Sequence, residues 1–103
     1  MKIAHVYFNG NLAGHLKERV PKKQYEFTYI ETYSGPPISL TLPLEKKSYQ
    51  FEKFPSFFEG LLPEGIQLEY LLRTLKIDRD DYYGQLLAVG EDTVGSVTVF
   101  ESK

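Results

Sequence analysis

The chain contains no cysteine, and this single absence removes several kinds of chemistry. Without thiols there can be no disulfide bond, no cysteine nucleophile and no thiolate metal site. A small domain that is stabilised without disulfides is typical of a reducing compartment. We therefore expect a cytoplasmic protein.

Long apolar runs and an excess of one charge are also missing. No stretch approaches the roughly 18 apolar residues of a membrane-spanning helix, and the first residues lack the apolar segment of a signal peptide. Lys and Arg number 12 against 14 Asp and Glu, so the net charge is −2 and the basic surface typical of nucleic-acid-binding proteins is absent. We expect neither a membrane nor a nucleic acid as a direct partner.

What the chain does have is enough apolar material for one core. Hydrophobic residues make up 42% of its 103 residues, and eight Tyr and seven Phe supply the 15% that are aromatic. This length is close to the usual size of one domain and leaves too little chain for two cores. We expect a single domain over residues 1–103.

The first half of the chain has the patterns of β-strands. Asn9-Gly10 follows a strand-forming segment and favours a type I′ hairpin turn, because both central positions of that turn need positive φ. Elsewhere apolar or aromatic residues alternate with polar ones, as on half-buried strands. Together these signals predict strands at 2–8, 12–16, 25–30, 38–42 and 49–51.

After Phe54 the spacing of apolar residues changes from two to 3.6, which is typical of helices. Helices are predicted at Ser56–Leu62, at about Glu64–Leu75, and from Asp78 as N-cap to Gly90, which stops the third helix. Strand-forming residues return at 94–100. The order predicts an α+β fold: a small, mostly antiparallel, barrel-like β-sheet with two to three helices between the penultimate and last strands.

The second predicted helix carries a leucine stripe. Its four leucines stand at i, i+3, i+4 and i+7, so they share one face, which we expect to lie on the core. On this interpretation Leu72→Ala costs roughly 2–5 kcal/mol. The stripe consists of Leu68, Leu71, Leu72 and Leu75.

Candidate catalytic and metal-binding groups do not form a recognisable set. His5 and His15 lie on paired strands and are expected to be neighbours, but the spacing of Asp and Glu indicates no further metal ligand near them. The glycine-containing segment 10–17 lacks the Gly-Lys-Ser/Thr ending of a phosphate-binding loop. Glu59 and Glu64 flank an apolar segment, as acidic residues at helix ends commonly do. We expect no catalytic, cofactor or metal site, and no enzyme.

The segment Phe54–Ile66 is the most informative part of the sequence. It contains six large apolar residues among two Gly and two Pro, and therefore cannot form one regular element. A tight corner between two helices is predicted. Two interpretations stay open: a well-buried corner, or a corner that exposes one or two apolar side chains to a partner.

The nonamer Phe57–Gly65 resembles a signature near the N-terminus of HipA-type serine/threonine kinases, the toxins of bacterial toxin–antitoxin systems. Further segments resemble the same family in the same order, so that the resemblance spans nearly the whole chain. Two departures stand out, since the family often has Arg in place of Glu91 and an aromatic residue, commonly Trp, in place of Ile66. The other matching segments are Ala13–Leu16, Phe27–Tyr29, Ile38–Leu44 and Val89–Val97.

A HipA-type kinase continues far beyond this segment, and its ATP site and catalytic Asp have no counterpart here. A stand-alone copy of the N-terminal subdomain is similar to the HipS family of tripartite HipBST systems. The resemblance implies an antitoxin that docks on a HipT-type kinase near its active site and blocks phosphorylation without catalysis, with the helix-turn-helix protein HipB as a further partner. The partner-binding residues expected are Phe58, Glu59, Leu62, Pro63, Glu64, Gly65 and Ile66.

Alternatives to direct inhibition remain open. The chain could be a scaffold that bridges HipT to DNA-bound HipB, or the excised N-terminal subdomain of a full-length HipA kinase, although the tail 101–103 is consistent with a natural end. Within the corner, Ile66 is the candidate anchor for the partner. The competing interpretation is that Ile66 begins the buried face of the second helix.

Overall fold

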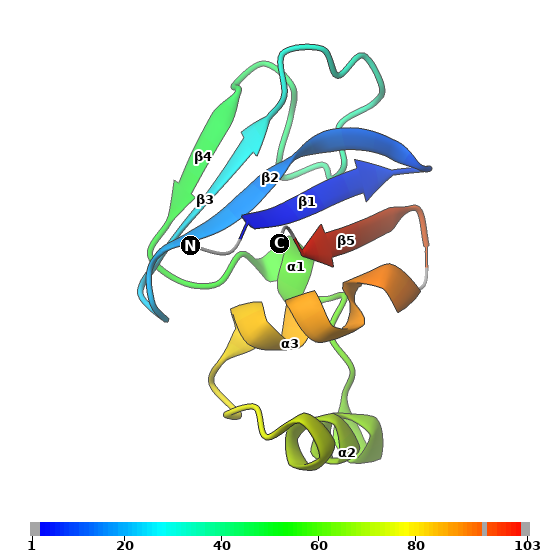
Figure 1. Ribbon diagram of the computed structural model, residues 1–103. Helices are drawn as coiled ribbons and strands as arrows, with labels where there is room; N and C mark the ends of the chain where they lie inside the picture. Colours follow the sequence, from blue (N-terminus) through cyan, green and yellow to red (C-terminus); the bar gives the residue numbers. More distant parts are fainter. Residues whose placement is uncertain (1–2, 94, 102–103) are drawn as a thin grey trace.

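Five antiparallel strands form one sheet (Figure 1). The helices come after the fourth strand and before the fifth in the sequence. The computed structural model describes residues 3–93 and 95–101, and the sheet order is β4-β3-β2-β1-β5. The elements are β1 Ile3–Phe8, β2 Asn11–Val20, β3 Gln24–Tyr29, β4 Ser48–Phe51, α1 Ser56–Glu59, α2 Gly65–Leu75, α3 Tyr82–Val89, the 3-10 turn η1 Gly90–Asp92, and β5 Val97–Glu101. Of the predicted strand at 94–100, position 94 lies outside the described residues, as does position 2 of the first strand.

The first hairpin forms as predicted. Asn9 and Gly10 have φ values of 50° and 83°, and Phe8 pairs with Asn11 across the turn. The second strand runs further than expected, to Val20, because a second turn with Lys22 at φ 64° joins it to β3. Both turns are local structures, and they set the register of the first three strands.

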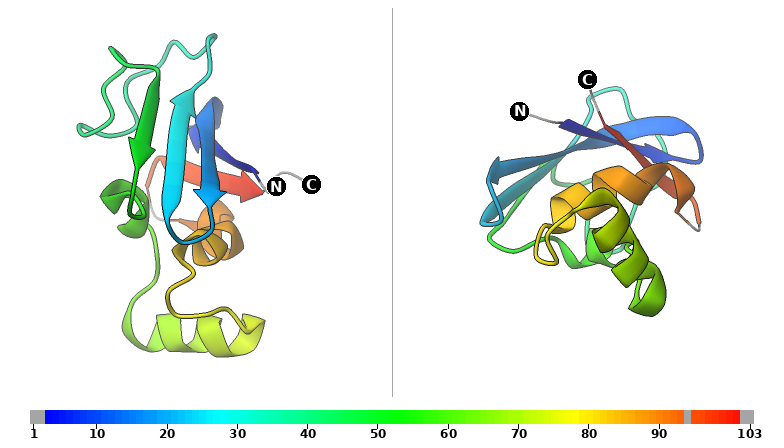
Figure 2. Two further views of the ribbon diagram at one scale, coloured as in Figure 1. Left: turned by 90° about the vertical axis from the view of Figure 1, so that its left-hand side faces the viewer. Right: turned by 60° about the horizontal axis from the view of Figure 1, so that its bottom comes forward.

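The core lies between one face of the sheet and the helices (Figure 2). Alternate residues of the strands point inward, as the period of two requires. Phe58 of α1 and Leu86 of α3 pack on this face and are fully buried. The buried strand residues are Ala4, Val6, Ala13, Leu16, Tyr25, Phe27, Tyr29, Val97 and Val99.

The predicted strand at 38–42 is wrong, because this segment is a loop. Its two ends are held by one side chain: the Tyr29 hydroxyl donates to the carbonyl of Leu42 at 2.5 Å and accepts from the amide of Ile38 at 3.1 Å. These bonds hold Ile38 and Leu42 in the core and leave Leu40, between them, 97% exposed. The alternation in the sequence is therefore not matched by burial, because Leu40, which a strand would place on the same face as Ile38 and Leu42, points into solvent.

The leucine stripe of α2 does not reach the core. The helix has no buried residue, and Leu75 is 52% exposed. The reason is that α3 and α1 already cover the inner face of the sheet, and α2 lies beyond α3 (Figure 2). The placement of Leu72 in the core is therefore wrong.

The third helix begins and ends near the predicted residues, for partly different reasons. Asp81 is the N-cap instead of Asp78, and its carboxylate accepts from the Gly84 amide at 2.9 Å. Gly90 is right-handed, with φ −60°, so it does not end α3 by a left-handed turn. A Cβ there would lie 2.4 Å from the Val99 carbonyl oxygen, so glycine is needed for the close approach to β5.

The α+β class, the antiparallel sheet and the three helices before the last strand are confirmed. The sheet is open and does not close into a barrel, since β4 and β5 each pair with one neighbour within the described sheet. None of the described helices has the length and apolar character needed to cross a membrane.

Candidate partner-binding corner

At the corner, the hydrogen bonds after α1 change from the α-helical spacing of four residues to a spacing of three. The amides of Leu61 and Leu62 donate to the carbonyls of Phe58 and Glu59, both at 3.1 Å, in successive three-residue turns. Pro63 has no amide hydrogen and cannot extend this series. Glu64 is then extended, with φ −130°, and leads into α2.

Phe58 anchors the corner from the inside. It is fully buried, and its ring centroid lies 5.7 Å from that of Phe27 on β3 and 5.2 Å from that of Phe57. Phe58 is one of the partner-binding residues predicted from the sequence. The structure places it in the core, where it supports the corner and has no surface to offer a partner.

Ile66 lies on the outside of the same corner. Gly65, the first residue of α2, has φ 60°, a left-handed conformation that is costly for residues with a Cβ. Nothing lies within 4 Å of the position where a Cβ would stand, so the backbone angle rather than close packing requires glycine there. After this turn Ile66 is 88% exposed, which excludes the interpretation that it begins a buried helix face.

The remaining corner residues form a half-buried apolar base with an acidic rim. Leu62 and Pro63 are partly buried, whereas Glu59 and Glu64 are exposed. A groove runs beside them, between the corner and the end of α3. The residues that line it carry two carboxylates, from Glu64 and Asp92, and no basic side chain.

The second exposed aromatic or aliphatic residue on this side was missed from the sequence. Tyr70 is 71% exposed and follows Ile66 by four residues, so both lie on the same face of α2, opposite the leucine stripe. The four-residue spacing could have identified it. The leucine stripe is the stronger apolar signal of this helix, and it predicts only the face that turns toward the fold.

Polar contacts connect α2, the loop that follows it, and α3. Arg79 makes a two-pronged ion pair with Glu69, at 2.7 and 2.8 Å, and this hydrogen bonding lowers the pKa of the Glu69 carboxyl. Gln85, the one buried polar residue of the described core, donates from Nε2 to the carbonyls of Asp78 and Arg79. The loop that follows α2 is thus held to α3, and the exposed ion pair serves to orient α2 rather than to stabilise the fold.

The other groups considered from the sequence lie elsewhere. The rings of His5 and His15 are neighbours, with centroids 4.7 Å apart, on the face of the sheet opposite the helices. Burial, followed by the nearby His5 and Lys17, lowers the pKa of His15. The described residues contain no group of three or more His, Cys, Asp or Glu side chains that could hold a metal ion.

A sequence model of the HipA N-terminal domain matches residues 4–100, almost the whole chain. The chain belongs to the HipA N-terminal domain family. A solved structure described as the N-terminal domain of HipA toxin has the same fold, with a TM-score of 0.80 and 28% identity over 100% of this chain and 94% of that one. The resemblance carried by the nonamer and the other segments is confirmed.

Two relatives in the family differ greatly in length. An uncharacterised protein of Haemophilus influenzae is 32% identical over 99 residues, which are 95% of this chain and 91% of that protein. The serine/threonine-protein kinase toxin HipA of Shewanella oneidensis is 33% identical over 64 residues, which are 62% of this chain and 14% of the kinase. The family therefore includes both a protein of about this length and a much larger kinase.

Proposed function

We propose that this protein is an antitoxin that binds a HipT-type serine/threonine kinase and inhibits it without catalysis, near its active site. In the HipA family the same domain belongs to kinase toxins. A separate copy of such a domain has a natural docking partner in a kinase related to HipA. Inhibition then requires only that the bound domain obstruct the active-site cleft.

The observation that carries the proposal is the exposure of Ile66. Ile66 does not stand alone: Tyr70, 71% exposed, lies one turn further on the same face of α2, and neighbouring exposed apolar side chains form the kind of patch that a partner buries. Phe58 fixes the corner to the core, so Ile66 is presented on a preorganised turn. A preorganised anchor binds with a smaller loss of conformational entropy.

The charge of the corner fits the same partner. Glu59, Glu64 and Asp92 are exposed around the apolar base. A kinase active-site cleft presents basic side chains and magnesium ions to the phosphates of ATP, and these are groups that carboxylates can also contact. An acidic rim around an apolar anchor complements such a cleft and favours association.

Co-expression tests the proposal. A HipT-type kinase from the same genome is expressed from one promoter and this protein from another, and growth is followed with and without HipB. We expect this protein alone to restore growth, and the purified protein to suppress kinase autophosphorylation at stoichiometric concentration.

Each alternative predicts a different result. Rescue only in the presence of HipB would favour the bridging scaffold. Activity only when the domain is joined covalently to a kinase would identify it as the N-terminal subdomain of a HipA kinase. Either result would contradict direct inhibition.

A further inference from the structure

The two edge strands of the sheet, β5 and β4, differ in whether their outward-pointing backbone groups are covered. On β5 the carbonyls of Val97 and Val99 point away from β1, because Asn9 donates to Ser96 and the ladder alternates from there. Thr93 donates its hydroxyl to the Val97 carbonyl, and Gly90 packs against the Val99 carbonyl. The turn η1 therefore covers this edge.

The edge formed by β4 is open. The Tyr29 amide donates to the Lys47 carbonyl at 2.8 Å, so the ladder with β3 continues through Tyr49 and Phe51. The alternation leaves the backbone N–H and C=O groups of Ser48 and Gln50 pointing outward. Among the described residues, no backbone hydrogen bond outside the ladder involves either of them.

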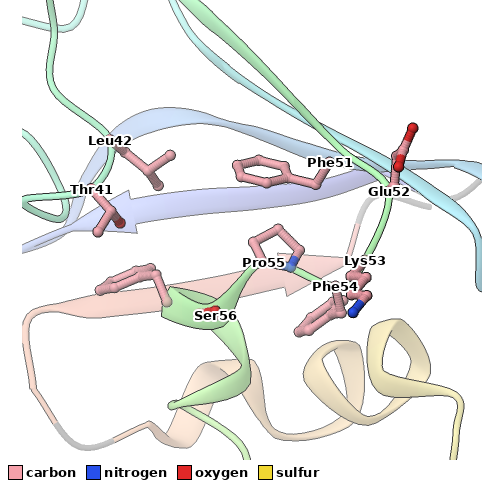
Figure 3. Close-up of a pocket in the computed structure, with 9 residues that line it drawn as sticks. Thr41, Leu42, Phe51, Glu52, Lys53, Phe54, Pro55 and Ser56 are labelled. Carbon is pink, nitrogen blue, oxygen red and sulfur yellow. The ribbon is translucent and has the colours of Figure 1, made fainter.

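An apolar groove lies directly beside this open edge, on the helix side of the sheet. Figure 3 shows the Phe51 side chain directed toward Leu42, with Pro55 below it. Phe57 of α1 completes the apolar lining. A strand added to β4 would place the side chains opposite Tyr49 and Phe51 on this same face, since directly paired residues point to the same side.

We propose that the β4 edge and this groove bind an extended segment of a partner protein by strand addition. The outward groups of Ser48 and Gln50 supply the backbone hydrogen bonds, and the groove takes an apolar side chain. Lys47 continues the register of Tyr49 and Phe51, so an acidic residue fits opposite it. The segment has the pattern apolar-x-apolar-x-acidic. The groove shares Phe57 and Pro55 with the start of the corner segment, but Ser48, Gln50 and Lys47 lie outside that segment, and the site does not depend on the proposed inhibition of a kinase.

A second copy of this chain is a poor occupant of the same edge. In a two-fold antiparallel pairing through Ser48 and Gln50, Lys47 of one copy falls opposite Phe51, Tyr49 or Lys53 of the other, depending on the register. The Phe51 register turns Lys47 toward the groove and leaves the groove without an apolar side chain opposite Phe51. The Tyr49 register brings Lys47 to a ring over which Lys46 already lies, 5.2 Å from the centroid, and the Lys53 register opposes two lysines. Lysines on edge strands commonly prevent self-pairing in this way.

Selection from a random library of displayed heptapeptides tests the proposal, followed by titration of synthetic selected peptides into ¹⁵N-labelled protein. We expect the selected peptides to share the pattern and to shift the amide resonances of Ser48 and Gln50. Gln50→Pro removes one outward N–H at an edge position where proline is tolerated. It should weaken binding at least tenfold, whereas the control Gln50→Thr, which keeps the N–H, should bind like the wild type.

A second variant, Lys47→Glu, tests the proposed binding register independently of Gln50→Pro. Lys47→Glu should change the selected residue opposite position 47 from acidic to basic, which tests the register even if Gln50→Pro unfolds. Selection of no peptide, or equal binding to a folded Gln50→Pro variant, would overturn the proposal. Sedimentation that shows a dimer sensitive to Gln50→Pro would instead identify a second copy as the occupant, and would also overturn it.

Discussion

Because α2 lies outside the core, truncating a leucine on α2 should lower the free energy of unfolding less than truncating one on α3. Leu86 on α3 is fully buried, so Leu86→Ala removes core atoms and leaves a cavity, which costs about 2–5 kcal/mol. Leu72 lies on a helix without a buried residue, where solvent can fill the space that truncation leaves. Only part of the transfer free energy of a leucine is then lost, about 1 kcal/mol.

Thermal and urea unfolding, followed by circular dichroism, would measure both variants. For a domain of about 100 residues each kcal/mol corresponds to a shift of about 4–8 °C in Tm. We expect Leu86→Ala to lower Tm by at least about 8 °C and Leu72→Ala by about half as much or less. Equal losses would show that α2 is part of the cooperative core, and would refute the conclusion that its leucines lie outside that core.

Three further predictions concern pH, capping and the partner. Because the pKa of folded His15 lies below the value of about 6.5 expected in the unfolded chain, the unfolded chain binds the proton first, so stability should fall as pH drops below about 6.5; His15→Gln should flatten the Tm profile below about pH 6.5, and an unchanged profile would refute the lowered pKa of His15. Asp81→Ala should cost about 1 kcal/mol in urea unfolding while Asp81→Asn, which can still cap α3, costs less; equal losses would argue against capping. Tyr70→Ala should weaken kinase binding in calorimetry without lowering Tm, and unchanged affinity would confine the interface to the corner.

The parts of the fold that depend on local chemistry could be predicted from the sequence. The Asn9-Gly10 turn needs only two residues with positive φ, and those residues are adjacent. The strand predicted at 38–42 is wrong because the segment is held at its ends by the Tyr29 hydroxyl, nine residues before Ile38, and not by a neighbouring strand. A pattern of period two correctly marked Ile38 and Leu42 as buried, but it also predicted a buried Leu40, which is 97% exposed.

For the candidate site too, the sequence predicts the local backbone but not which side chains are buried. Glycine and proline in Phe54–Ile66 correctly indicate a corner, because they restrict the backbone locally. Which apolar side chain points inward depends on the position of β3, and only the structure places Phe58 beneath the corner and Ile66 outside it. The leucine stripe of α2 likewise indicates an apolar face, while its distance from the core follows from the space that α3 occupies.

The affinity of Ile66→Asp for a HipT-type kinase tests the central claim most directly. Leu40→Asp is the matched control, since Leu40 is 97% exposed on the loop between β3 and β4, away from the corner. With both variants melting like the wild type, we expect calorimetry to show unchanged binding for Leu40→Asp and a loss of at least about 2 kcal/mol, roughly 30-fold, for Ile66→Asp. An Ile66→Asp variant that folds normally and binds the kinase as tightly as the wild type would contradict the account.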